Sequence, residues 1–146
     1  MDKQGVAVAA TVVAGGFIAL QAPINAGLGK HTGSFAAATI SFAVGTVLLA
    51  TIVAVGGKGG DLSEVAHVNW YLLLGGALGA AYVFSALVLV SQIGAGAVAA
   101  ATVTGQLTTS VILDRIGFLG LDQEPLTASR IAGVGLLLAG TYLIVR

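Results

Sequence analysis

The sequence predicts an all-α integral membrane protein, a bundle of five transmembrane helices, on three observations. First, 57% of its 146 residues are hydrophobic and only 8% are charged, whereas about a quarter of the residues in a soluble domain carry charge. Second, Asp, Glu, Lys and Arg are absent from residues 4–29, 31–57, 65–113 and 131–145. Third, a helix needs roughly 20 mostly apolar residues to cross a bilayer, and these stretches supply them. We expect a single transmembrane domain over residues 1–146.

The first two spans are separated by one short polar break. The first is predicted over residues 5–28 and ends at "GLGKHTGS". It is longer than the apolar region of a signal peptide, roughly 7–15 residues, so we expect it to be retained. The second is predicted over residues 34–55 and ends at "GGKGGD", because clustered glycines end a helix.

The remaining three spans are predicted from the length of the apolar stretches and from the polar residues that separate them. A single helix over residues 65–113 would exceed about 70 Å at 1.5 Å per residue, more than twice the bilayer core. We therefore expect a hairpin of residues 69–90, opened by the interfacial "NWY", and residues 95–113, after "SQIGAG". The fifth span is predicted over residues 126–145, before the terminal Arg146.

Five spans place the two termini on opposite sides of the membrane, and the basic residues divide unevenly between these sides. The N-terminal side holds Lys3, Lys58, Arg115 and Arg130, and the other side holds Lys30 and Arg146. Because excess Lys and Arg mark the cytoplasmic side, this division weakly favours a cytoplasmic N-terminus. It leaves two topologies open, a fixed orientation and a dual topology in which copies insert both ways.

Composition also bounds the chemistry. There is no cysteine and the formal net charge is zero, so we expect no thiol chemistry and no binding of nucleic acid. The acids and the two histidines are not clustered, so neither a metal nor another cofactor is expected. No paired carboxylates and no nucleophile–base couple occur at a spacing that would support catalysis, so we expect that the protein is not an enzyme.

The stretch "LQAPINAGLGKH" places polar side chains inside the first span. Gln21 and Asn25 are four residues apart and share one helix face. Pro23 lacks the amide that would bond the carbonyl of Ala19, so it bends the helix or frees a backbone acceptor. The two amides can bind a polar solute or hold a neighbouring helix, and both interpretations stay open.

Polar residues in other spans extend this prediction. Ser41 lies in the second span, Gln106 brings a large amide to the fourth, and Tyr82 is core filler or a stacking wall in the third. We predict that the substrate contacts Gln21, Asn25, Ser41, Tyr82 and Gln106. At 1.5 Å per residue, Gln106 lies about 10 Å from the N-terminal side and Gln21 about 20–24 Å. Inverting a second copy would bring its Gln106 to the level of Gln21.

Small residues are abundant in the spans and favour close helix packing, because membrane helices associate through small side chains. Glycine occurs 22 times, and we predict packing roles for Gly45, Gly75, Gly79 and Gly135. Five helices with little extramembrane mass make a thin bundle. We therefore expect a dimer, or a partner chain, surrounded by membrane lipid.

Ionisable residues are missing from the centre of every span, which disfavours proton coupling through a buried carboxylate. Asp114 lies at the end of the fourth span. We expect it to act as a helix cap or to pair with the neighbouring Arg115.

Three stretches resemble a known family: "GGFIALQAPINAGLGKHTGSFAAATISFAVGT", "TGQLTTSVILDRIGFLG" and "SRIAGVGLLLAGTYLIVR". They are similar to the YdcZ-type family (domain of unknown function 606) of the drug/metabolite transporter superfamily. The resemblance implies a small multi-pass protein of the bacterial inner membrane that is assembled from two halves. The halves are a homodimer or a paired homologous subunit, with antiparallel pairing among the options. Unlike the small multidrug exporters, the chain has no carboxylate in its first helix, so their coupling mechanism is not carried over.

Together these observations predict a small-solute transporter or exporter of that superfamily. It works by alternating access around a neutral polar site near the bilayer midplane. Amides and hydroxyls suit a polar or weakly cationic solute. Two alternatives remain, a channel-like facilitator and a non-transporting partner subunit of another membrane protein.

Overall fold

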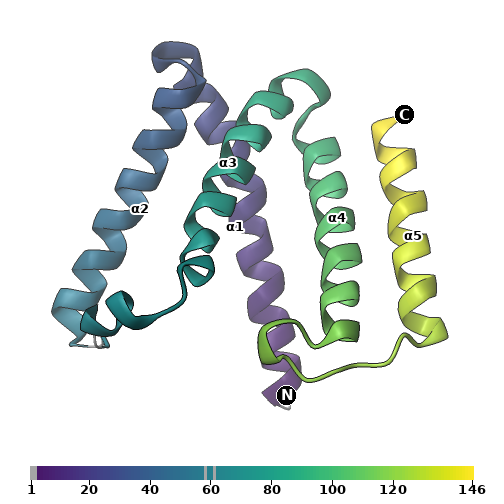
Figure 1. Ribbon diagram of the computed structural model, residues 1–146. Coiled ribbons are helices and arrows are strands. Elements are labelled where there is room, and N and C mark those ends of the chain that lie inside the picture. The colour runs from purple at the N-terminus through teal and green to yellow at the C-terminus, as the bar shows by residue number, and fades with distance from the viewer. Residues whose placement is uncertain (1–2, 58, 61) are drawn as a thin grey trace. The chain divides into compact units, whose positions relative to one another are not determined.

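The computed structural model describes residues 3–57, 59–60 and 62–146, and in these residues the chain is helical, without strands. Five helical segments are long and apolar enough to cross a membrane (Figure 1), which confirms the prediction of an all-α protein with five candidate membrane-spanning helices. Lys58, assigned above to the N-terminal side, lies outside the described residues. The α-helices are α1 (Lys3–Thr32), α2 (Ser34–Gly56), α3 (Leu74–Ile93), α4 (Ala95–Ile116) and α5 (Ala128–Val145), with the 3₁₀ helices η1 (Leu62–His67), η2 (Trp70–Leu73) and η3 (Phe118–Gly120).

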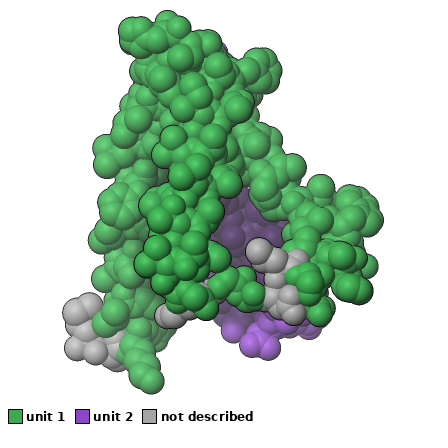
Figure 2. All heavy atoms as spheres, turned by 90° about the vertical axis from the view of Figure 1, so that its left-hand side faces the viewer, with its two compact units in different colours: residues 1–91 green, residues 92–146 purple. Residues whose placement is uncertain are grey.

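The chain divides into two compact units, Met1–Ser91 and Gln92–Arg146, coloured separately in Figure 2. The first unit contains α1, α2 and most of α3, and the second contains α4 and α5. Each is described by itself below. The prediction of a single domain stays a prediction.

A single glycine joins α1 to α2. Gly33 has φ 84° and ψ 154°, a region that is essentially restricted to glycine. Its amide donates to the carbonyl of Gly29 at 2.9 Å, and its own carbonyl accepts from the amide of Ala37 at 3.0 Å. Because the bond from Gly33 to Gly29 continues the helical pattern up to the turn, α1 runs four residues beyond the predicted end at residue 28, to Thr32.

Side chains of α3 complete the first unit. The rings of Phe35 on α2 and Phe84 on α3 stack with centroids 4.3 Å apart. A Cβ atom placed on Gly79 would lie 3.6 Å from the Phe42 ring, so α3 also approaches α2 closely there. Buried Val83 and Ala22 line a narrow gap between α3 and α1. The unit is therefore a hairpin with a third helix packed through side chains.

The second unit is held together by a partly buried pair of hydroxyls. Thr104 on α4 is only 7% exposed. Its Oγ1 lies 2.6 Å from Oγ1 of Thr141 on α5, and both hydroxyls lie within hydrogen-bond distance of the carbonyl of Ala100, so that one can donate to this carbonyl while the other donates to its partner hydroxyl. Thr108, by contrast, bonds only within its own helix, to the carbonyl of Thr104. The link from Thr104 to α5 depends on a neighbouring helix, so it cannot be read from one span.

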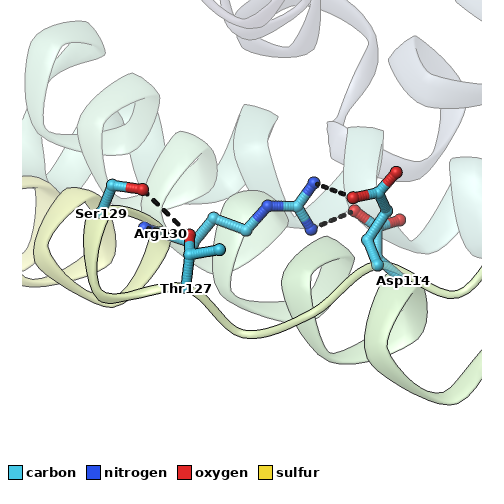
Figure 3. Close-up of polar contacts among 5 residues, drawn as sticks. Asp114, Thr127, Ser129 and Arg130 are labelled. Carbon is cyan, nitrogen blue, oxygen red and sulfur yellow. Dashed lines mark hydrogen bonds and ion pairs between the residues drawn. The ribbon is translucent and has the colours of Figure 1, made fainter.

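An ion-pair cluster closes the α4–α5 connection of this unit (Figure 3). Nη1 of Arg130 lies 3.4 Å from Oδ2 of Asp114, and its Nη2 lies 3.4 Å from Oε2 of Glu124. The partner of Asp114 is thus Arg130 rather than the expected Arg115. Gly117 ends α4 in the left-handed conformation, which turns the chain back and lets α5 bring its first-turn arginine to this carboxylate.

Apolar side chains cover much of the exposed surface of the long helices. Val12 is 70% exposed, Val55 85% and Leu136 75%. Only a hydrocarbon solvent or another protein surface accommodates so many exposed apolar groups. These faces therefore suit contact with lipid or with another subunit.

Candidate functional site

A groove between α1 and α2 in the first unit brings together three of the predicted site residues. Its volume is about 580 Å³, and Gln21, Asn25 and Ser41 are its polar lining residues. The other side chains that line the groove are apolar, and Phe17 of α1 is one of them. Gln21 and Asn25 reach the groove together because four residues make slightly more than one helical turn.

The same two amides also line the tight gap between α1 and α3. There they meet Tyr82, which is partly buried, and the small side chain of Ala86. This gap has no room for a water molecule. The Gln21–Asn25 face of α1 is thus open toward α2 and closed toward α3, and the predicted residues Gln21, Asn25, Ser41 and Tyr82 gather on three helices of one unit.

Asn25 carries an unusual feature at the centre of this arrangement. Its side chain is only 5% exposed, and its amide nitrogen Nδ2 is buried without any hydrogen-bond partner in the described chain. A buried donor left unsatisfied costs about 1–3 kcal/mol. Such a group is rare in a native structure and requires a specific reason. A bound molecule or a neighbouring subunit can supply the missing acceptor.

Pro23 loosens the backbone between these two amides. The helix continues through it, but proline has no amide hydrogen, so the carbonyl of Ala19 loses its usual donor. The predicted interruption of the hydrogen-bond ladder follows from this chemistry. It places a weakened segment of backbone at the polar face of α1.

The hydroxyl of Ser41 differs from those of its neighbours. Thr39 and Thr51 on α2 and Ser85 on α3 each donate to the carbonyl four residues earlier, at 2.8–2.9 Å. Ser41 makes no such bond within the described residues, and neither does the hydroxyl of Tyr82. Both hydroxyls therefore remain available to a ligand.

Charge is absent from the lining of this site. Neither the groove nor the gap has an ionisable acid or base among its lining residues other than the phenol of Tyr82. The described part of the chain also contains no group of three His, Asp or Glu side chains that could hold a metal ion. The arrangement can bind by hydrogen bonds and apolar contact, and it has no full charge with which to compensate an ion.

Comparison with family models identifies what kind of protein carries this site. A model described as "Putative inner membrane exporter, YdcZ" matches residues 6–143. The chain belongs to this family. Neither the search of curated proteins nor that of solved structures returned a significant match. The YdcZ family description supports a membrane transporter of the inner membrane rather than an enzyme.

Gln106, the remaining predicted substrate residue of this YdcZ-family chain, lies on α4 in the second unit. Its side chain is exposed and makes no hydrogen bond to another described residue. The site described in the first unit does not include it, and its role stays a prediction.

The predicted packing glycines differ in their surroundings. A Cβ atom on Gly79 would contact Phe42 of α2, whereas Cβ atoms on Gly45, Gly75 and Gly135 would meet no atom within 4 Å. The described chain leaves room at these three positions. Their packing role stays a prediction, and it would concern a helix from another subunit.

Proposed function

We propose that the chain is one subunit of a small-solute exporter that works by alternating access. Its solute site is formed by Gln21, Asn25, Ser41 and Tyr82. The unpartnered amide nitrogen of Asn25 carries this proposal, because it lies between an open groove and a closed gap. The family description of an inner membrane exporter supports the direction of transport.

Alternation follows from the unequal way in which α2 and α3 are attached to α1. The α1–α2 pair is joined by the one-residue turn at Gly33, about which the two helices can close on one another. Helix α3 meets α1 through small and aromatic side chains around Tyr82. We propose that α3 separates from α1 when the α1–α2 groove closes, so that the solute held by Asn25 is exposed first on one side and then on the other.

We further propose that two subunits form the transporter, either two copies or this chain and a paired homologue. The exposed apolar faces and the open space at Gly45, Gly75 and Gly135 support this assembly. Antiparallel pairing is tested with a single cysteine at Glu64, an exposed residue of η1. Intact cells are treated with an impermeant maleimide. If this cysteine is labelled only in part, and labelling becomes complete when the cells are permeabilised, the result supports dual topology. Labelling from one side only leaves a parallel dimer or an inverted partner chain.

Transport is tested with purified protein in proteoliposomes. A panel of neutral and cationic small solutes is first screened for compounds that raise the thermal unfolding temperature. The best compound is then measured by counterflow, in which a carrier accumulates labelled solute transiently above equilibrium. We expect counterflow by the wild type and its loss in Gln21→Leu and Asn25→Leu. Thr51→Val is the matched control, because the hydroxyl of Thr51 is bonded within its own helix.

The same assay separates the alternatives. Equilibration without transient accumulation would support a channel-like facilitator. Absence of any flux, with a copurifying membrane protein, would support a non-transporting partner subunit. Counterflow that is equal in the wild type and in both α1 variants would overturn the assignment of the site.

A further inference from the structure

The groove of the first unit has a lining that restricts what it can hold. Its polar groups are the two amides of Gln21 and Asn25 and the hydroxyl of Ser41. All three are uncharged, and the buried Nδ2 of Asn25 is a donor that lacks an acceptor. A solute that reaches this nitrogen when the gap toward α3 opens must therefore bring it a hydrogen-bond acceptor.

The charged residues of the unit argue against an ionic solute. Apart from the terminal Lys3 and Lys30, helices α1, α2 and α3 contain no Asp, Glu, Lys or Arg. Lys30 is exposed, lies five residues after Asn25 and lines neither the groove nor the gap. Neither a cation nor an anion at Asn25 would find a counter-ion among the lining residues of the groove or the gap, and a buried unpaired charge is strongly unfavourable. A cation would also have the like charge of Lys30 nearby.

The walls of the groove are apolar over most of its length. Phe17, Ile24 and Val44 are among the side chains that line it. Its volume of about 580 Å³ falls within the range of roughly 300–1,000 Å³ typical of small-molecule pockets. The groove thus matches a molecule with a substantial apolar body.

We infer that the solute is an uncharged amphiphile whose carbonyl or hydroxyl oxygen accepts a hydrogen bond from Asn25 Nδ2. Its apolar part lies along Phe17, Ile24 and Val44, and Ser41 offers a second hydrogen bond. This inference rests on the proposed function. It narrows the expected class, a polar or weakly cationic solute, to the neutral members that carry an apolar group.

The sequence offers a direct probe, because Asn25 and Asn69 are its only asparagines. Labelling the asparagine side-chain amides with ¹⁵N therefore yields two NH₂ signals from the full-length protein in lipid nanodiscs. Asn69 is an internal reference, because its Nδ2 already donates to the hydroxyl of Tyr71 at 3.1 Å. Asn25→Leu assigns the signals by deleting one of them.

Four probes share a phenyl ring on a four-carbon chain and differ at the end of that chain: 4-phenylbutanamide, butylbenzene, 4-phenylbutyrate and 4-phenylbutyltrimethylammonium. We expect 4-phenylbutanamide to move the Asn25 amide protons downfield saturably and to leave Asn69 unchanged. The ionic probes should bind at least tenfold more weakly, and butylbenzene should give no downfield shift. An ionic probe that binds as well as the amide would overturn the inference. An Asn25 signal that no probe moves would overturn it too, and would place a neighbouring helix at Nδ2.

This measurement and the counterflow assay fail independently. If 4-phenylbutanamide shifts the Asn25 signal but no solute shows counterflow, the binding chemistry stands and the transport function is wrong. If counterflow depends on Asn25 while the cationic probe shifts its signal equally well, transport stands and the solute class is wrong.

Discussion

Replacing Asn25 by Leu should stabilise the protein while abolishing its function. Leu has the branched shape of Asn but no polar atoms, so the change removes the buried Nδ2 that has no partner. Relief of an unsatisfied buried donor amounts to about 1–3 kcal/mol. The gap toward α3 is tight, and overpacking there would offset part of this gain. The open groove toward α2 gives the bulkier side chain space, and we expect a net gain of about 1–2 kcal/mol in the free energy of unfolding.

The gain is measured by reversible unfolding in mixed micelles with increasing dodecyl sulfate. Trp70, the only tryptophan, reports on the start of α3, and far-ultraviolet circular dichroism reports on all helices. Asn69→Leu is the matched control, because Asn69 is exposed and bonded to a neighbouring ring, and its stability should change little. A loss of about 1 kcal/mol or more in Asn25→Leu would refute the reasoning, since it would show that the amide already has a partner.

Further predictions concern the contacts that hold each unit together. Thr104→Val and Thr141→Val should each lower the unfolding free energy by about 0.6–1.7 kcal/mol, and the double variant by less than the sum, because they share one hydrogen-bond cluster. Additive losses in the same unfolding titration would contradict this cluster. Arg130→Gln should lower the unfolding free energy by at most about 1 kcal/mol, an effect that high salt removes, because the side chains of its ion pairs are a third to a half exposed. Gly33→Ala should lower the unfolding free energy by about 1–3 kcal/mol because of the positive φ of Gly33. Gly45→Ala should leave the stability of the monomer unchanged and weaken dimerisation, as measured by analytical ultracentrifugation.

The spans could be predicted from the sequence because length and polarity decide them. Charges and clustered glycines bound each apolar stretch, and the helices of the structure follow these breaks within a few residues at most ends. The end of α1 was placed four residues too early. The glycine and lysine that follow residue 28 predict a helix end, but the helix ends only before Gly33, which adopts a backbone conformation that other residues rarely adopt.

Contacts between helices could not be predicted, because they depend on the rotation of one helix against the next. The link from Thr104 to Thr141 joins residues 37 positions apart, and a single span contains no trace of it. The pairing of Asp114 with Arg130 likewise depends on the path of the α4–α5 connection. The helical spacing of Gln21 and Asn25 did predict their shared face, because that relation lies within one helix.

The central claim is that a solute binds in the α1–α2 groove, and alkylation of a single cysteine tests it most directly. The chain has no native cysteine, so Ser41→Cys provides one thiol in the groove and Val47→Cys provides one on the exposed apolar surface of α2. In nanodiscs, a polar maleimide should react with the cysteine at position 41 much faster than with that at position 47. A solute that stabilises the protein should slow the first reaction at least tenfold. The account would be contradicted if the cysteine at position 41 reacted as slowly as the one at position 47. It would also be contradicted if the solute did not change the alkylation rate at position 41.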